Sequence, residues 1–336
     1  MEKARFKWVL RERNRKIAAK TEAFTEQQAR RVRSFHSSFK EYSPTPLIEL
    51  TSLAQHLGIK NLFVKDESYR FGLNAFKVLG GSFAIGSYIA NELGEDIDDL
   101  PYMRLVSDEV RSLLGSKTFI TTTDGNHGRG VAWTANRLKQ QAIVYMPQGS
   151  AAERLANIRA EGAQAEITDM NYEDTVRYTS ELAQKNGWII VQDTAWDGYT
   201  RIPLWIMQGY MTMALEAYEQ LPVKPTHIFL QAGVGSLAGS VQGFFADIYG
   251  SSCPLTFIVE PKGADCLYQT AAANDGSLHS VTGRLETIMA GLACGEPNSI
   301  AWEILGNLSD GFISCPDYAA AQGMRILGNP LAGDTK

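Results

Sequence analysis

The feature that most constrains the fold is a regular alternation of short apolar runs with longer helical patterns, which begins near residue 61. The short runs are rich in β-branched and aromatic residues, which favour strands, and the segments between them show helical periodicity. The expected strands are 61–65, 118–122, 142–146, 165–168, 188–191, 227–230 and 255–259. The expected helices are 78–93, 128–139, 153–161, 172–186, 202–220, 237–249 and 318–327. This alternation is typical of α/β chains with mostly parallel sheets.

Length and composition narrow the class of protein further. With 336 residues, of which 44% are hydrophobic, the chain is long enough for two domains of ordinary size. The formal charge of −5 leaves no overall excess of positive charge for nucleic acid, and no apolar run is long enough to span a membrane. The four cysteines lack disulfide-scaffold spacing, so we expect a cytoplasmic protein; pairing of Cys266 with Cys294 stays open.

Two segments lie outside the alternation. The first forty residues carry a basic excess, which we expect to form a solvated or subunit-contacting arm rather than a binding patch. The basic residues of this arm are Lys3, Arg5, Lys7, Arg11, Arg13, Arg15, Lys16, Lys20, Arg30, Arg31 and Arg33. The acid-rich segment 94–114 contains a proline, and we expect it to be a long surface excursion between a helix and a strand.

Three motifs carry residues suited to chemistry. The first is Asn-Ala-Phe-Lys-Val-Leu-Gly-Gly at 74–81, where Lys77 opens an apolar helix. A lysine amine becomes a Schiff-base nucleophile when desolvation or a nearby positive potential lowers its pKa, and a helix N-terminus supplies such a potential. Taken alone, a lysine at a helix start also fits a solvated surface residue.

The second motif, Asp124-Gly-Asn126-His127-Gly, ends an expected strand and begins a helix. The carboxyl ends of parallel strands are where α/β sheets bind ligands, although this sequence also fits an ordinary turn and cap. The third, Gly233-Val234-Gly235-Ser236, also joins a strand to a helix. Backbone N–H groups and the helix dipole make such a loop suited to a phosphate, and it is neither a Walker loop nor a complete dinucleotide motif.

These motifs, in this order, resemble those of the fold-type II pyridoxal-phosphate enzymes. The resemblance covers about residues 40–325, with a fourth match at Thr-Ile-Met-Ala-Gly-Leu, 287–292. It implies an α/β fold like that of the tryptophan synthase β subunit, with two open, mostly parallel domains. The larger domain is expected at 1–85 and 200–336 and the smaller at 86–199. A family segment that faces the pyridine nitrogen is expected beyond residue 336.

The resemblance also implies roles for residues of this chain. Lys77 is expected to carry pyridoxal 5'-phosphate as a Schiff base, and Asn126 to contact the 3′ oxygen of the cofactor. The expected phosphate ligands are Gly233, Val234, Gly235 and Ser236, and Gly291 is expected to border the ring. We assign no metal ligands, and a homodimer is expected from the family. His127 is expected to be a structural donor rather than a base.

Two acidic residues indicate which reaction is catalysed. Asp124 stands where the dehydratases of this family carry serine, and Asp193 ends another expected strand, although Asp193 alone also fits a turn. A carboxylate is a better general base than a hydroxyl at neutral pH and attracts a cationic group on the substrate. The two acids thus point to a substrate with a β-ammonium group. The resemblance implies elimination of ammonia from D- and L-2,3-diaminopropionate to give pyruvate and ammonia, with Lys77, Asp124 and Asp193 as catalytic residues.

Two alternatives remain at this stage. One is a serine or threonine dehydratase, or a cysteine desulfhydrase, of the same fold, for which Asp124 has no evident use. The other is a truncated protein that binds pyridoxal phosphate, or only a partner protein, without turnover. The sequence does not say which acid serves which stereoisomer.

Overall fold

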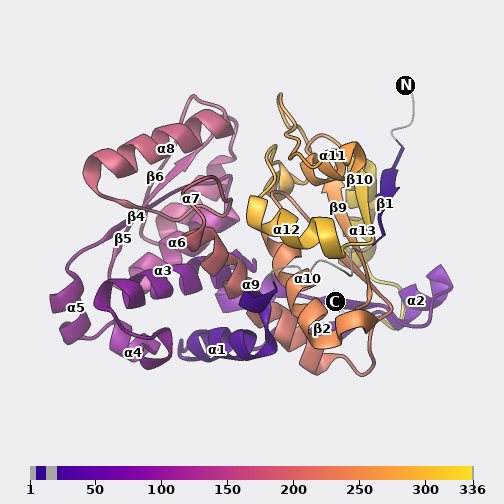
Figure 1. Cartoon of the computed structure of the whole chain (residues 1–336), viewed down its shortest axis with the longest axis horizontal. Coiled ribbons are helices and arrows are strands. Elements are labelled where there is room, and N and C mark those ends of the chain that lie inside the picture. The colour runs from indigo at the N-terminus through magenta and orange to yellow at the C-terminus, as the bar shows by residue number, and fades with distance from the viewer. Residues whose placement is uncertain (1–4, 13–20, 335–336) are drawn as a thin grey trace. The chain divides into compact units, whose positions relative to one another are not determined.

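The computed structural model describes residues 5–12 and 21–334. Contacts group the chain into two compact units, whose helices and strands are labelled in Figure 1. Unit 1 comprises residues 1–22, 44–67 and 213–336, and unit 2 comprises residues 23–43 and 68–212. Residues 23–43 and 68–85 thus group with 86–199, whereas the sequence-based division placed them with 200–336. Which segments act as the cofactor-binding domain stays a prediction.

Unit 2 is built on a fully parallel four-stranded sheet in the order β6-β5-β4-β7. Its strands are β4 (Thr118–Thr122), β5 (Gln141–Met146), β6 (Gln164–Ile167) and β7 (Ile189–Ile190). Strand β4 is buried from Phe119 to Thr122, as expected for an apolar central strand with helices packed against it. Its carboxyl end is therefore held rigidly inside the unit.

The helices of unit 2 include two that begin close to each other. They are α1 (Glu26–Ser37), α3 (Lys77–Leu93), α4 (Tyr102–Leu105), α5 (Asp108–Leu114), α6 (Asn126–Arg137), α7 (Ala152–Ala160) and α8 (Tyr172–Asn186), and α9 (Arg201–Gln220) continues into unit 1. A Cβ atom at Gly130 of α6 would lie 2.8 Å from the Cα atom of Val78. Only glycine permits this approach, which sets the start of α3 against α6.

Unit 1 has a four-stranded sheet in the order β1-β10-β9-β8. Strands β8 (His227–Gln231), β9 (Leu255–Pro261) and β10 (Gly311–Cys315) are parallel, and β1 (Lys7–Leu10) pairs antiparallel with β10. Its further helices are α10 (Ser236–Tyr249), α11 (Cys266–Ala273), α12 (Ser299–Leu308) and α13 (Asp317–Gly328). The apolar face of α10 is buried, which anchors the loop in front of it.

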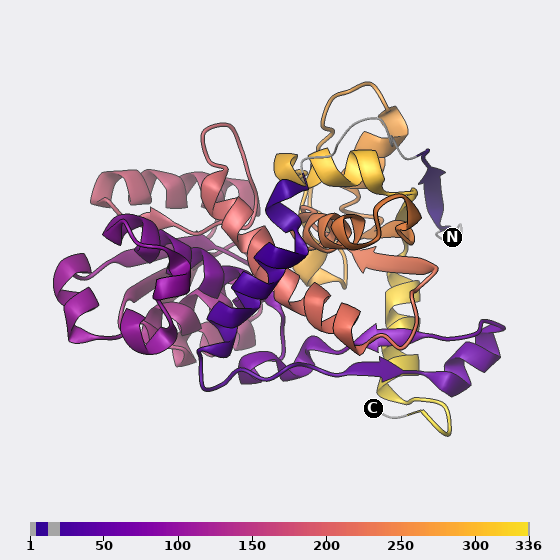
Figure 2. The same cartoon turned by 60° about the horizontal axis from the view of Figure 1, so that its bottom comes forward.

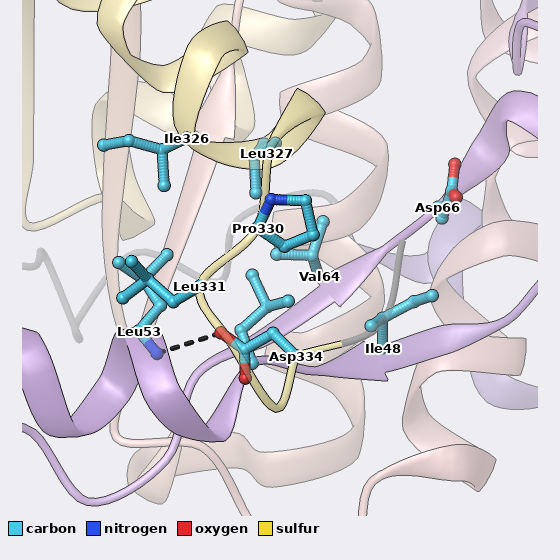
Figure 3. A pocket seen from close by; sticks show the side chains of 10 residues that line it. Ile48, Leu53, Val64, Asp66, Ile326, Leu327, Pro330, Leu331 and Asp334 are labelled. Atoms are coloured by element: carbon cyan, nitrogen blue, oxygen red, sulfur yellow. Dashed lines mark hydrogen bonds between the residues drawn. The ribbon is translucent and has the colours of Figure 1, made fainter.

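A second, two-stranded sheet in unit 1 pairs β2 (Leu47–Glu49) with β3 (Phe63–Lys65), joined by α2 (Thr51–Leu57) (Figure 2). The Asp334 carboxylate accepts hydrogen bonds from the backbone N–H groups of Ser52, at 2.7 Å, and Leu53, at 3.0 Å. Figure 3 shows Asp334 beside a mainly apolar cavity of about 180 Å³, with Ile326 and Leu331 in its wall. A residue near the C-terminus thus supplies the cap that α2 lacks locally.

The expected α/β class with mostly parallel sheets is confirmed. Each expected strand and helix is present, with ends that differ by a few residues. The sequence reasoning missed β1, β2 and β10. Strands β1 and β2 are only four and three residues long and carry little periodic signal, whereas β10 is as long as the predicted strand β4. In the residues that the structure describes, no helix is long and apolar enough to cross a bilayer.

One local expectation needs correction. The segment 94–114 is not simply a surface excursion, since it contains α4 and α5 and buries Leu100, Leu105 and Val110. In the described part of the basic arm, Lys7 lies exposed in β1, and Arg31 in α1 forms ion pairs with acids of the 94–114 segment. Whether the arm contacts another subunit stays a prediction. The arm residues that fall outside the described part of the chain are Lys3, Arg13, Arg15, Lys16 and Lys20.

Candidate active site

The strand order of unit 2 changes direction at β4. Strands β5 and β6 follow on one side of β4, and β7 lies on its other side, with Ile120 opposite Ile190. In open α/β sheets the crevice outside the carboxyl ends of the strands at such a switch point binds ligands. Asp124 follows β4 and Asp193 follows β7. Two acids separated widely in sequence therefore follow neighbouring strand ends.

Asp193 forms an ion pair with the predicted cofactor lysine. Lys77 is the first residue of α3, and its Nζ atom donates to Asp193 Oδ2 at 2.5 Å. Burial by itself would raise the pKa of Asp193, but the Lys77 ammonium outweighs burial and lowers that pKa to about 2. The side chain of Lys77 is 24% exposed and that of Asp193 only 9%. The pair thus holds an amine that a ligand can reach.

His127 supports Asp193 from α6. Its Nε2 atom lies 2.7 Å from the backbone oxygen of Val191, so Nε2–H donates there, and Nδ1 lies 3.9 Å from Asp193 Oδ2. Burial lowers the pKa of His127, which favours the neutral ring. Within the described residues, His127 Nδ1 and the buried Tyr210 hydroxyl have no hydrogen-bond partner. The charges of Lys77 and Asp193 also act on the pKa of Tyr210, which burial raises.

Asp124 has a different environment. The Nη1 atom of Arg154, from α7, donates to Asp124 Oδ2 at 2.7 Å and to its backbone oxygen at 3.1 Å. Burial raises the pKa of Asp124, while Lys77 and Arg154 lower it and Asp193 raises it further. The Asp124 side chain is half-buried. The charges of Lys77 and Asp193 therefore influence the pKa of Asp124. The sequence did not suggest Arg154 as its ion-pair partner.

Asn126 is the first residue of α6 and is exposed. Gly125 precedes it, and a Cβ atom at Gly125 would lie 3.0 Å from Arg154 Cδ, so a side chain there would crowd Arg154. Unit 2 thus carries Lys77, Asp124, Asn126 and Asp193 around one end of its sheet. None of these residues lines the cavity of Figure 3.

The predicted phosphate loop lies in unit 1, between β8 and α10. Gly235 is the N-cap residue of α10 with φ +102°, a conformation that side chains rarely adopt. The loop is held by Asn298, whose Nδ2 atom donates to Ser236 Oγ at 2.8 Å and whose N–H donates to Val234 O at 2.8 Å. A glycine cap leaves the helix N-terminus open to an anion, since it has no side chain to accept from the first turn.

A second segment of unit 1 packs against this loop. A Cβ atom at Gly233 would lie 3.2 Å from Cys294 Sγ, and Gly291 lies in a short 3₁₀ turn at 290–292 with open space around it. Cys266 Sγ lies 3.9 Å from the Gly233 oxygen. All four cysteines fall in the described part of the chain, and no disulfide joins them. Cys266 and Cys294 thus both border Gly233 without a bond between them.

These features fit pyridoxal phosphate. Unit 2 supplies a reachable amine on Lys77 and two buried polar atoms, His127 Nδ1 and Tyr210 OH, that lack partners in the described residues. Unit 1 supplies a glycine loop that a Cβ atom would crowd, at a helix N-terminus suited to a phosphate. Each unit, taken by itself, therefore carries groups suited to this cofactor.

Comparisons with known proteins agree with the site. A family model described as pyridoxal-phosphate dependent enzyme matches residues 39–330. The diaminopropionate ammonia-lyase of Salmonella typhimurium is 53% identical over 306 residues, which are 90% of this chain and 76% of the relative. The crystal structure of holo diaminopropionate ammonia lyase from Escherichia coli has a TM-score of 0.91 and 49% identity, covering 99% of this chain and 82% of that chain.

The structure of the Escherichia coli enzyme in complex with D-serine is also similar, with a TM-score of 0.90 and 49% identity. It covers 98% of this chain and 83% of the other. The family model spans parts of both units, and the positions of the lysine motif, both acids and the glycine loop lie within its range of 39–330. The chain therefore belongs to the fold-type II pyridoxal-phosphate-dependent enzymes, in the group of the diaminopropionate ammonia-lyases.

Proposed function

We propose that this chain eliminates ammonia from both the D and L isomers of 2,3-diaminopropionate and gives pyruvate and ammonia. One observation carries the proposal: two carboxylates follow the strands on either side of the switch point, and one of them holds the Lys77 amine at 2.5 Å. Its similarity to the diaminopropionate ammonia-lyases supports the same conclusion. The reaction class requires a base near the α-carbon and an anion near the β-ammonium group, and carboxylates provide both.

Pyridoxal phosphate is the cofactor of this family. We propose that Lys77 binds it covalently, that Asn126 contacts its 3′ oxygen, and that Gly291 borders its ring. The residues proposed for the phosphate are Gly233, Val234, Gly235 and Ser236. When bound, the cofactor supplies an electron sink for the charge that develops at the substrate's α-carbon.

The chain's own residues then move protons and hold the substrate. Asp124, Asp193 or the amine of Lys77 removes the α-proton. The negative charge of the carboxylates attracts the β-ammonium group, which leaves from the β-carbon as ammonia. The released enamine takes up water and loses the second ammonia, so that one diaminopropionate and one water give one pyruvate and two ammonia. The Lys77 ammonium keeps Asp193 ionised, and His127, fixed by its bond to Val191, has a structural role beside Asp193 rather than acting as a base.

The alternatives within the fold differ in the leaving group. Serine, threonine and cysteine lose a hydroxyl or thiol group, for which a fixed carboxylate at Asp124 has no evident use. A non-catalytic cofactor-binding protein would need no acid beside Lys77. Asp124 therefore favours the lyase over the dehydratase and desulfhydrase, and the ion pair between Asp193 and Lys77 favours it over the non-catalytic protein.

A substrate screen tests the proposal. The holoenzyme should form pyruvate from both isomers of diaminopropionate, with higher kcat/KM than from serine, threonine or cysteine. Product formation is followed as pyruvate or oxobutyrate for each pure isomer. Preference for a hydroxy or thiol substrate would identify the dehydratase or desulfhydrase alternative, and cofactor binding without product would identify the non-catalytic one.

The role of Lys77 has its own test. Lys77→Ala should abolish turnover, because no amine remains at the start of α3 to bind the cofactor. After borohydride reduction of the wild-type protein, peptide mapping should find the pyridoxyl group on Lys77. A pyridoxyl group on another lysine would show that the motif had been aligned wrongly. The homodimer, the cytoplasmic location and the cofactor-binding domain at 1–85 with 200–336 stay predictions.

A further inference from the structure

The backbone ladder between β4 and β7 ends just before the two acids. Ile120 pairs with Ile190, and the N–H of Val191 donates to Ile120 O at 2.9 Å. Ile120 and Ile190 are the last residue pair of this ladder. The next N–H group of β4 on the side of β7 is that of Thr122. It donates instead to the side-chain oxygen Oε1 of Gln192 at 3.0 Å. The Gln192 side chain thus replaces the missing backbone partner.

Gln192 makes several further hydrogen bonds. Its Oε1 atom also accepts from Thr121 Oγ1 at 3.0 Å, and its Nε2 atom donates to the Tyr172 hydroxyl at 2.8 Å. Its backbone N–H donates to the Tyr199 hydroxyl at 2.8 Å. Gln192 is only 1% exposed. Because buried polar groups are costly when unpaired, these bonds hold Gln192 in one conformation.

Gln192 directly precedes Asp193, so a fixed Gln192 fixes the direction in which the Asp193 side chain leaves the backbone. We propose that Gln192 is a positioning residue that holds Asp193 against the Lys77 amine. Its kinetic consequence rests on the proposed function, because it assumes that Asp193 takes part in proton transfer. An amide suits this position because it both accepts and donates without adding a charge that would alter the ionisation of Asp193.

A matched residue separates positioning from general stability. Gln140 lies at the opposite, amino-terminal end of β4, where its Oε1 atom accepts from the N–H of Lys117 at 2.7 Å. Both glutamines therefore bind a backbone N–H group at an end of the same strand, but only Gln192 adjoins a proposed catalytic acid. Gln140→Met and Gln192→Met each remove the side-chain oxygen that accepts from a backbone N–H group, at opposite ends of β4.

The kinetic test compares these variants of the holoenzyme on each pure isomer of diaminopropionate. Gln192→Met should lower kcat by about 10- to 100-fold on the isomer whose α-proton Asp193 removes. A displacement of a catalytic group by about 1 Å lowers the rate by a factor of that order. KM should change much less, and Gln140→Met should retain wild-type kcat. Tyr172→Phe, which removes one bond to Gln192 and spares the rest, should shift kcat in the same direction by less.

A second measurement does not depend on turnover. In the cofactor-free protein, limited acetylation followed by peptide mass spectrometry gives the labelling of Lys77 relative to Lys185, an exposed lysine of α8. Gln192→Met and Tyr172→Phe should raise this ratio, because a loosened Asp193 no longer holds the Lys77 ammonium. Gln140→Met should leave it unchanged.

The outcomes decide the proposal. If Gln192→Met folds, as judged by circular dichroism, and matches Gln140→Met in both kcat and the labelling ratio, Gln192 is not a positioning residue. If Gln192→Met does not fold, the same two measurements on Tyr172→Phe decide. Failure of the wild type to use diaminopropionate would overturn the proposed function, while the labelling ratio would still test the contact between Gln192, Asp193 and Lys77.

Discussion

At the scale of single residues, the two acids of the site have the same side chain in different environments. Asp193 is buried and paired with Lys77, which lowers its pKa to about 2 despite the burial. Asp124 is half-buried, its pKa is raised by burial, and its ion-pair partner is Arg154. Two carboxylates with different ionisation can take different roles in one reaction. The next two predictions follow from this difference.

Asp124 and Asp193 should serve different stereoisomers. A base must lie on the same face of the substrate as the proton it removes, so one acid cannot readily serve both isomers. Asp124→Asn and Asp193→Asn should each lose about 10²- to 10⁴-fold on one isomer and less on the other. The measurement is kcat/KM for each pure isomer, together with KM, since either acid could also bind the β-ammonium. Equal losses on both isomers would favour Lys77 as a shared base.

Arg154 should set the lower pH limit of activity on the isomer whose α-proton Asp124 removes. The Arg154 cation lowers the pKa of Asp124, so Arg154→Met should raise that pKa. A base works only when ionised, so the acidic limb of the kcat/KM profile should move to higher pH. Arg159→Met, on the exposed side of the same helix α7, is the control and should leave the profile unchanged. An unmoved limb in Arg154→Met would mean that Asp124 is not the titrating base.

At the scale of elements, the loop between β8 and α10 shows why glycine is needed at a helix start. Gly235 has φ +102°, and a Cβ atom there would lie 3.2 Å from Leu267 and 3.3 Å from Leu305. The bond from Asn298 to Ser236 ties the loop to the start of α12. Both features restrict the loop to one conformation before an anion binds, so less conformational entropy is lost on binding.

Gly235→Asp should release the cofactor. The substitution strains the backbone, crowds Leu267 and places a carboxylate where a phosphate is proposed to bind. Affinity should fall by at least about tenfold, equivalent to about 1.4 kcal/mol. Gly250→Asp is the control, because Gly250 ends the same helix with φ +52° and open space around it. Cofactor absorbance after dialysis is compared for the two variants, and equal retention would contradict the phosphate assignment.

At the scale of the whole molecule, contacts between distant parts of the sequence close each unit. In unit 2 the pair Lys77–Asp193 joins residues 116 positions apart. In unit 1 Asp334 caps α2, and its bond from the Leu53 N–H is drawn in Figure 3. Its bond from the Ser52 N–H spans 282 positions, and the hydroxyl of Ser52 donates to Ala332 O at 2.7 Å. Such contacts restrict the chain over long loops and contribute to the cooperativity of folding.

Asp334→Ala should lower the free energy of unfolding by about 1 kcal/mol, because two N–H groups of α2 lose their acceptor. Asp334→Asn should cost less, since the amide oxygen can still accept one of the bonds. Urea unfolding of both variants gives the two free energies. If alanine and asparagine leave stability at the wild-type value, the contact contributes nothing to unit 1, and the helix end is solvated instead.

The sequence by itself determined the local features of this protein. The periodicity of short segments predicted the strands β4 and β8 and the helices that follow them, because strand and helix patterns depend on residues within one or two turns. Glycine, asparagine and lysine at fixed places in the motifs predicted the two loops. The resemblance that these motifs carry then pointed to pyridoxal phosphate, to Lys77 and to both acids.

Only the tertiary structure decided how the acids are used. A crossover connection can place β7 at either edge of the sheet, so the position of Asp193 against Lys77 could not be read from the local pattern. The roles of Gln192, Arg154 and Asp334 also depend on hydrogen bonds to residues 30 to 282 positions away. A buried glutamine or a helical arginine has no distinctive local pattern, because its partner is chosen by packing rather than by its neighbours in sequence.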